Sequence, residues 1–585
     1  SRLAAVALII VMSLSMARVA GDGGGEADAV DAAVRADGYV MVGWTGDFEY
    51  WNPLIPTMVE DYVACNLIHS SLFMYDEDLQ GPVGDLATGW LQTLNPDGSM
   101  TTEIAITHNA YFRTASDPYD TSRQLTADDV EFTFNLIMDN PDRGTWRSNF
   151  IGVTDVDALD AYTVSITTAW PKATLFDDLE GVPILPEYVY GSMRDPFAQA
   201  EPDELVGSGP FIFDAMLEGS WYSFAKAPNY HGEADYGAER TVSVPGIIYS
   251  VFYDNIALSL AINFGDLDVV SIGSDVNTFL DVLGSYATTN VIKQAVSEPG
   301  ICDVAINAIP MSFRTSTYGT GNPHLLDPAV RQALVMTLNK TYITDVILGG
   351  LAEPATSVIQ PGYWQADIEE LRFDPSAARD LLMNSGYADY DGDGYLEATA
   401  SAYAVVNGLV DVGDELSMIR CDAPDTDPTY YAVAAMWAAD ARDAGIGLVP
   451  RMLSEGVMIN MDWYKADYDV WVWHWGWGPE PIGSALSTWL TAEIVPGGLN
   501  CQMPMGPWWY DDTNYTDAPA EWDLQGPYSA YDQNLSMALE TLDREDRKVI
   551  VDNLQQMVYD SHTEIPPFYD IGLYGYTDRT PQPAM

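Results

Sequence analysis

The sequence predicts a mixed α/β protein that folds as two or three domains. Its 585 residues exceed what one hydrophobic core usually organises. From Tyr39 onward, short strand patterns alternate with capped helix patterns, and the sequence contains no internal repeat. Hydrophobic residues make up 47% of the chain, which is normal for a folded protein.

The first 37 residues differ in composition from the rest of the chain. Residues 3–16 form an uncharged apolar run after Arg2, and small residues follow it. This run has the length of the apolar region of a signal peptide and is shorter than the roughly 20 residues of a membrane span. We expect residues 1–20 to be a signal-like segment that directs export or, if it is retained, an anchoring or assembly segment. Residues 21–37 are expected to be a flexible acidic linker.

Strand and helix signals follow in order along the chain. Strands are expected at residues 39–44 and 100–106, the second after an Asn-Pro-Asp-Gly turn. A helix is expected over residues 125–137, with Thr126 as its N-cap. Helices are also expected over residues 327–338 and 374–382, because each range begins with an aspartate cap followed by proline.

An acidic loop starts at residue 389. Its carboxylates occupy positions one, three and five of a calcium-loop pattern, and a glycine at position six allows the sharp turn. Position twelve is alanine instead of glutamate, so the full pattern fails there. We expect either an acidic turn or a structural Ca²⁺ site. The candidate ligands are Asp389, Asp391, Asp393, Tyr395 and Glu397.

Four tryptophans occupy alternate positions at 471, 473, 475 and 477. A period of two predicts a β-strand with all four indoles on one face. Smaller apolar residues fill a core with fewer unsatisfied N–H groups, so this row indicates the wall of a ligand site, with a packed core strand as the alternative. His474 lies on the opposite face, where we expect it to be a core residue.

The charge balance restricts the partners. The chain has 86 acidic and 25 basic residues, a net charge of −61. Such a surface repels nucleic acid and anionic lipid headgroups, and it keeps a protein soluble at high salt. The four cysteines have no metal-binding spacing, and Cys421 and Cys501 could pair in an exported chain. With six histidines and no catalytic motif, the chain is predicted not to be an enzyme.

Taken in order, nine short landmarks resemble the extracellular solute-binding proteins of ABC importers, in the oligopeptide, dipeptide and nickel group. The resemblance covers about residues 39–580. The landmarks lie at residues 51–54, 125–130, 207–211, 229–231, 265–268, 327–334, 339–340, 373–378 and 467–478.

The resemblance implies an α/β, two-lobed periplasmic-binding-protein-like fold with a hinge and an extra subdomain on the first lobe. The first lobe is then expected at residues 38–60 and 204–298, the extra subdomain at 61–203 and the second lobe at 299–567. Residues 568–585 return to the first lobe, and this return is expected to be incomplete.

The resemblance also implies a function and a set of binding residues. The chain is expected to be an exported, extracellular protein that captures oligopeptides between its lobes by hinge closure and delivers them to an ABC transporter permease. No cofactor is required. The expected ligand-binding residues are Trp473, Trp475, Trp477 and Glu480 on the second lobe and Asp47, Tyr50 and Trp51 on the first.

One departure from the family pattern leaves the ligand class open. In peptide-binding relatives an aspartate after the Gly-Trp region pairs with the α-amino group of the ligand. Residues 478–481 are Gly-Pro-Glu-Pro, and Glu480 is the nearby carboxylate. A metal chelate or an oligosaccharide is therefore an alternative ligand. Replacing Trp477 with alanine is expected to weaken binding and to leave the Tm nearly unchanged.

A second hypothesis belongs to a different class. The same fold could serve as a cell-surface or filament subunit that assembles through residues 3–16. Deleting residues 1–20 distinguishes this hypothesis from the binding-protein hypothesis. If the shortened protein is the same monomer at the same location, assembly through this segment is excluded.

Overall fold

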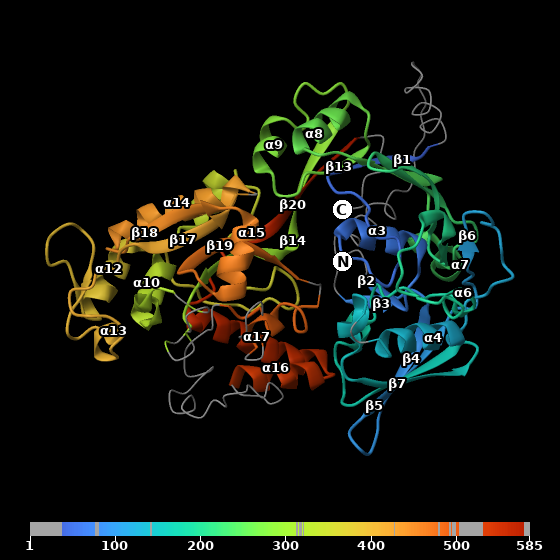
Figure 1. Cartoon of the computed structure of the whole chain (residues 1–585), viewed down its shortest axis with the longest axis horizontal. Helices are drawn as coiled ribbons and strands as arrows, with labels where there is room; N and C mark the ends of the chain where they lie inside the picture. The colour runs from blue at the N-terminus through green and yellow to red at the C-terminus, as the bar shows by residue number, and fades with distance from the viewer. Residues whose placement is uncertain are drawn as a thin grey trace. The chain divides into compact units, whose positions relative to one another are not determined.

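The computed structural model divides the chain into two compact units (Figure 1). Unit 1 comprises Ser1–Gln294 and Gly572–Met585, and unit 2 comprises Ala295–Ile571. The crossings expected at 298/299 and 567/568 each lie four residues from these boundaries. The structure describes residues 38–75, 81–140, 143–309, 311, 314, 319, 321–425, 427–477, 480–490, 493, 499–501 and 530–577. The expected signal-like segment and acidic linker lie outside the described residues.

The main sheet of unit 1 combines parallel and antiparallel strands. Strand β1 (Val40–Trp44) pairs in parallel with β12 (Gly246–Val251) and with β13 (Val269–Ser271). Strand β11 (Trp221–Lys226) pairs antiparallel with β12 and with β10 (Phe211–Leu217). The strand expected at residues 39–44 is confirmed as β1. The remaining elements around this sheet are α3 (Val59–Ile68), α7 (His231–Tyr236), η3 (Gly237–Arg240), α8 (Asn255–Phe264) and α9 (Val276–Asp281).

A second, antiparallel sheet in unit 1 has its own core. Its order is β4 (Ala87–Leu94), β5 (Met100–Ile106), β8 (Thr163–Thr168) and β7 (Val153–Asp160), and α4 (Ala127–Met138) packs against β7 and β8. The expected strand at 100–106 and the helix capped by Thr126 are confirmed. The smaller elements of this part are β2 (Phe73–Tyr75), β3 (Pro82–Gly84), β6 (Arg113–Thr114), η1 (Trp146–Phe150), α5 (Leu175–Asp178), α6 (Glu187–Tyr190), η2 (Pro202–Glu204) and β9 (Val206–Gly207).

Unit 2 is built on four long strands. Strand β19 (Val470–Gly476) pairs antiparallel with β14 (Val291–Ile306) and in parallel with β17 (Ile419–Pro424), which pairs in parallel with β18 (Leu448–Leu453). Strand β20 (Tyr569–Thr577) follows β14 in the sheet order and returns the chain to unit 1, where it pairs with β13. The long helices of unit 2 are α10 (Pro328–Thr337), α12 (Pro375–Asn384), α14 (Pro428–Asp443), α16 (Ala530–Glu540) and α17 (Arg544–Ser561).

The short elements of unit 2 connect these strands and helices. They are η4 (Pro323–Leu326), α11 (Lys340–Tyr342), η5 (Ile343–Ile347), β15 (Tyr387–Ala388), β16 (Glu397–Ala398), α13 (Tyr403–Val406), α15 (Glu455–Met458), η6 (Ile459–Trp463) and η7 (Leu486–Trp489).

Aspartate caps start several of the helices. Asp327 accepts a hydrogen bond from Ala329 N at 2.9 Å, Asp374 from Ala377 N at 2.9 Å and Asp427 from Thr429 N at 2.8 Å. In each case proline fills the first helical position, where its missing N–H costs nothing. The helices expected at 327–338 and 374–382 are therefore confirmed as α10 and α12.

Two further properties follow from the described residues. None of their helices combines the length and the apolar character that crossing a membrane requires. The four cysteines are buried and free, so the pairing of Cys421 with Cys501 that the sequence left open does not form.

Candidate ligand-binding site

In open α/β sheets, ligands bind at the carboxyl ends of the parallel strands. In unit 1 this edge is formed by the ends of β1, β12 and β13, which run in parallel. The candidates Asp47, Tyr50 and Trp51 follow β1 directly. The fold therefore places the first-lobe candidates at the edge where this architecture binds ligands.

The candidates of this edge differ in what they contact. The Asp47 carboxylate accepts hydrogen bonds from Tyr222 Oη at 2.5 Å and from Phe48 N at 2.8 Å. Trp51 is buried and its ring stacks on Phe48 with the centroids 5.5 Å apart, so Trp51 contributes to the core. Tyr50 is 36% exposed, which leaves its ring accessible.

In unit 2 the carboxyl edge is formed by the ends of β17, β18 and β19. Four acidic residues lie near this edge. Asp427 caps α14 after β17, Glu455 begins α15 after β18, Glu298 lies on β14 near the pairing of Gly300 with Gly476, and Asp570 lies on β20. The edge therefore concentrates carboxyl groups.

Asp570 is the most perturbed of these carboxyl groups. Burial, and then the like charges of Glu298 and Asp427, raise its pKa to about 8. A Cβ atom at position 300 would lie 2.5 Å from Asp570 Oδ2, so the aspartate fits only because Gly300 has no side chain. A cation brought to this edge would stabilise the ionised form of Asp570. The sequence analysis missed this residue.

The strand predicted from the tryptophan row is confirmed as β19 for Trp471, Trp473 and Trp475, whereas Trp477 follows its last residue. The four indoles lie in different surroundings. Trp471 and Trp473 are buried in one core cluster with Tyr468. Trp477 is 8% exposed and belongs to a second cluster, against which the half-buried Trp475 packs. The rings of Trp477 and Trp489 are in contact, with their centroids 6.2 Å apart. Among the described residues, neither indole Nε1 has a hydrogen-bond acceptor, although both atoms are buried. The role of Trp473, Trp475 and Trp477 in ligand binding stays a prediction.

His474 points to the opposite face of β19, as the period of two predicts. The expectation that it is a core residue is wrong, because its side chain is exposed. Its ring stacks on Tyr430 of α14, with centroids 5.8 Å apart and planes 7° apart. His474 is exposed because it lies near the carboxyl end of β19. His474 thus joins Asp427 and Glu455 at the candidate site.

Glu480 is half-buried, and its carboxylate accepts two hydrogen bonds from its own loop. Ile482 N donates to Oε1 at 2.8 Å and Gly483 N donates to Oε2 at 2.6 Å. These amides stabilise the ionised carboxylate and hold the turn in place. Binding of a ligand amine by Glu480 stays a prediction.

The acidic loop after α12 brings carboxylates together. One oxygen each from Asp389, Asp391 and Asp393 lies within 4.8 Å of the others. Arg379 pairs with Asp389 at 3.1 Å, and Glu397 accepts a hydrogen bond from Tyr390 N at 2.9 Å. The oxygens are of the type that Ca²⁺ prefers. Calcium binding by these residues with Tyr395 stays a prediction.

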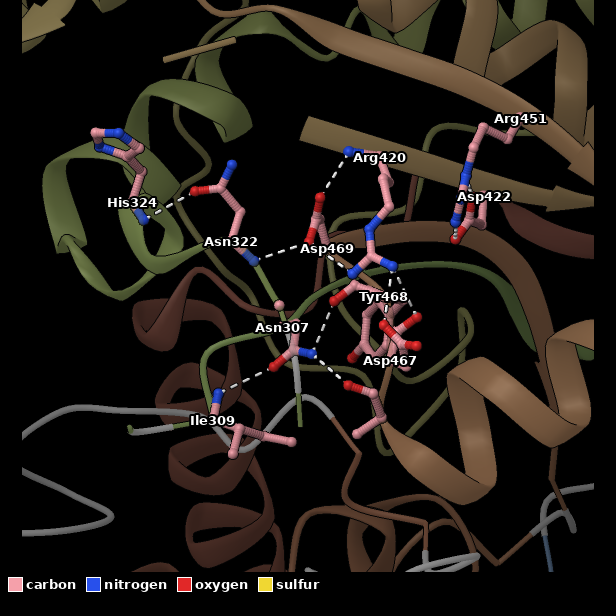
Figure 2. A network of polar contacts seen from close by, with 12 residues as sticks. Asn307, Ile309, Asn322, His324, Arg420, Asp422, Arg451, Asp467, Tyr468 and Asp469 are labelled. Carbon is pink, nitrogen blue, oxygen red and sulfur yellow. Dashed lines mark hydrogen bonds and ion pairs between the residues drawn. The ribbon is translucent and has the colours of Figure 1, made fainter. Parts of the chain in front are cut away.

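A polar network marks the opposite end of β17 and β19 (Figure 2). Asp469 accepts hydrogen bonds from the backbone N of Arg420 and of Asn322, each at 2.8 Å, and pairs with the Arg420 guanidinium at 3.0 Å. Asn307 donates to the carbonyl oxygens of Ala466 and Tyr468, both at 2.9 Å. This network fixes the loop after β14 to the amino-terminal ends of the strands, so its role is structural.

The model of the bacterial extracellular solute-binding proteins, family 5, matches residues 81–495. The chain belongs to this family. This membership is consistent with the expectation that the chain is not an enzyme, because the family binds solutes. The expectation of an extracellular protein agrees with the family description.

Relatives of known name share moderate identity with the chain. Oligopeptide-binding protein AppA of Bacillus subtilis is 22% identical over 411 residues, which cover 68% of this chain and 69% of AppA. Di/tripeptide-binding protein 1 of Pseudomonas aeruginosa is 26% identical over 292 residues, 47% of this chain and 50% of that protein. A Brucella ovis protein, named among the peptide-binding proteins of ABC transporters, is 25% identical over 391 residues. The match covers 65% of this chain and 66% of the Brucella protein.

Solved structures share the fold. CtaP of Listeria monocytogenes, an ABC transporter substrate-binding protein, has a TM-score of 0.69 at 18% identity, and 92% of this chain and 94% of CtaP are covered. NikZ of Campylobacter jejuni in complex with Ni(L-His) has a TM-score of 0.66 at 19% identity, with the same coverage. The two-lobed periplasmic-binding-protein-like fold is confirmed. The filament-subunit hypothesis receives no support from these relatives.

Proposed function

We propose that this protein is an exported receptor that captures oligopeptides and delivers them to an ABC transporter permease. The family membership supports solute binding, and the names of the Bacillus and Pseudomonas relatives support peptides as the solute. Delivery to a permease is supported by the name of the Brucella relative. The protein acts outside the membrane, at the cell surface.

The carboxyl edge of unit 2 is the observation that carries the peptide proposal. A peptide has an N-terminal ammonium group, which needs a counter-charge when it leaves water. Glu298, Asp427 and Glu455 lie at this edge, and Asp570 beside them can give up its proton when an ammonium group binds. They take the role that the family's aspartate after the Gly-Trp region performs in relatives, and that residues 478–481 replace here with Gly-Pro-Glu-Pro.

A metal chelate is the second candidate ligand, because His474 is exposed at the same edge. Imidazole is a frequent ligand of nickel, and carboxylates can complete its coordination. The structure of NikZ, which has the same fold, contains Ni(L-His).

Native mass spectrometry of gently purified protein tests the proposal directly. We expect a spread of bound short peptides, which denaturation releases for sequencing. A thermal shift assay with those peptides should then raise the Tm, by the equivalent of about 4 kcal/mol at a peptide concentration of 1,000 Kd. Stabilisation by Ni²⁺ with L-histidine, together with no response to peptides, would establish the chelate instead.

A further inference from the structure

Helix α8 of unit 1 exposes an apolar face. Ile256, Leu260 and Phe264 are 55%, 41% and 56% exposed, and they follow one another at intervals of four residues. Residues four apart on a helix are neighbours on one face. Single exposed apolar residues are common on protein surfaces, but a continuous row of three is not.

The opposite face of α8 holds the helix firmly in unit 1. Leu258 and Ile262 are fully buried, and a Cβ atom at Gly43 of β1 would lie 2.4 Å from Leu258 Cδ1. Asn263 is also buried, and it donates to the carbonyl oxygens of Val282 at 2.9 Å and of Ser285 at 3.1 Å. The exposed row therefore belongs to a rigid helix.

Helix α9 widens this surface. Asn255 at the start of α8 donates to Asp275 at the start of α9 at 3.3 Å, and Asn263 contacts the residues that follow α9. The two helices therefore run side by side in the same direction (Figure 1). On α9 and the loop after it, Leu280 is 45% exposed and Tyr286 is 97% exposed. We call Ile256, Leu260, Phe264, Leu280 and Tyr286 the α8 face.

Charge around the α8 face indicates what covers it. Helix α8 itself has no charged residue, and the segment from Phe252 to Lys293 contains five aspartates and a single basic residue, Lys293. A protein partner with an apolar groove bordered by Lys and Arg complements this arrangement. A second copy of the chain would bring the same carboxylates and the same net charge of −61 against it. An anionic lipid surface is repelled for the same reason. The aspartates are Asp254, Asp266, Asp268, Asp275 and Asp281.

We propose that the α8 face is the surface with which unit 1 docks onto the extracellular side of its permease. This inference rests on the proposed function, because it names a contact in the delivery step. The apolar row supplies the buried centre of the interface, and the exposed aspartates of the same segment, Asp254, Asp266 and Asp281, meet basic side chains of the permease. The long-range field of an acidic protein also accelerates its encounter with a basic surface.

The test is the double variant Ile256→Lys with Leu260→Lys. Both positions are exposed and lysine is a good helix former, so the Tm should stay within about 2 °C of the parent value. We expect peptide uptake by cells that lack the chromosomal copy to fall at least tenfold, while the Kd for the recovered peptides changes less than twofold. The matched control is Met537→Lys with Val549→Lys, at positions 55% and 70% exposed on α16 and α17.

Two results separate this inference from the proposed function. Uptake equal to that of the control variant, with intact peptide binding, would overturn the docking surface and leave peptide capture standing. If the unmodified parent protein binds no peptide, the proposed function itself is overturned. Photo-cross-linking then decides the docking surface by itself, with p-benzoylphenylalanine at position 260 in intact cells and at position 549 as control. A cross-link to a membrane subunit of an ABC transporter supports it, whereas a cross-link to a second copy, to lipid or to nothing overturns it.

Discussion

The indole Nε1 of Trp471 donates a hydrogen bond to Asp303 Oδ2 at 2.8 Å, and both side chains are fully buried. The bond joins β19 to β14 diagonally, since Asp303 pairs in register with Trp473 and Trp471 pairs with Ala305. Burial raises the pKa of Asp303, and hydrogen bonds with Glu564 and Trp471 oppose that rise. Part of the tryptophan row therefore stabilises a buried carboxyl group.

Replacing Trp471 with phenylalanine should destabilise the protein. The ring keeps most of its apolar contacts, but Asp303 loses its indole donor. Leaving a buried polar group unsatisfied costs about 1–3 kcal/mol. We expect that decrease in the free energy of unfolding, measured by urea denaturation. Adding Asp303→Leu should recover part of the loss, and equal stability of the single variant and the parent would contradict this account.

Replacing Trp477 with alanine is now expected to lower stability as well as binding. The sequence analysis placed this indole at a pocket mouth, where truncation would leave the Tm unchanged. Trp477 is 8% exposed and belongs to the cluster that includes Trp489 and Tyr531. Removing a buried tryptophan side chain costs about 3–5 kcal/mol. Trp475→Ala, at a half-buried position, is the comparison, and calorimetry with peptide should show weaker binding at a smaller loss of Tm.

The period of two predicted the strand and its two faces but could not show what covers each face. The cluster that contains Trp477 also includes residues of α16 and α17, which follow more than fifty positions later in the chain. Local patterns contain no signal for a cluster assembled from such distant segments. Caps are different, because Asp327 and Asp374 satisfy amides within three residues, so both helix starts were predictable.

In the candidate site, too, residues with local signals were predictable and residues brought together by distant segments were not. Asp47 and Tyr50 were found because they follow a strand directly. Asp570 was missed because strand pairing brings it from the end of the chain to Gly300, and the sequence offers a glycine and an aspartate 270 residues apart. Asp427 carried a weak signal, since an Asp-Pro pair after a strand marks a helix start at the sheet edge.

Asp462 makes stability depend on pH. This aspartate is fully buried, and neither carboxylate oxygen has a hydrogen-bond partner among the described residues. Burial, and then the nearby Asp422, raise its pKa to about 8. The folded state therefore holds a proton that the unfolded state releases at about pH 4. The resulting stability is fully present below that pH and is lost as the pH rises toward 8.

Asp462→Asn removes this titration. We expect the variant to be more stable than the parent at pH 8, by at least about 1.4 kcal/mol, the equivalent of one pKa unit. At pH 4, where both the folded and the unfolded parent still hold much of the proton, the two proteins should be nearly equal. Urea denaturation at both pH values measures the difference, and parallel pH profiles for parent and variant would show that Asp462 is not the group responsible.

We expect the acidic loop that starts at Asp389 to bind calcium. If Asp389, Asp391 and Asp393 bind Ca²⁺, 1–10 mM of the ion should raise the Tm and a chelator should reverse the shift, because ligand that binds the folded state stabilises it. Asp391→Asn with Asp393→Asn should abolish the response. An equal shift with Mg²⁺ and in the variant would indicate general screening of negative charge instead.

Asp570 should couple ligand binding to proton release. Its pKa of about 8 means that it is mostly protonated at pH 7 in the free protein. An ammonium group bound beside it favours the ionised form and expels the proton. The affinity for a peptide should therefore rise with pH between 5 and 7, by no more than about tenfold per unit. Calorimetry in buffers of different ionisation enthalpy counts the released protons.

Asp570→Asn supplies the decisive comparison. The amide keeps the size of the side chain beside Gly300 but cannot ionise, so we expect about tenfold weaker peptide binding, no proton release and a flat affinity between pH 5 and 7. Glu545→Gln, which removes a carboxylate on α17, is the charge-matched control and should bind as the parent does. A variant at position 570 that still releases a proton would show that Asp570 is not the coupled group, whereas a pH-independent parent would remove the ammonium contact from this edge altogether.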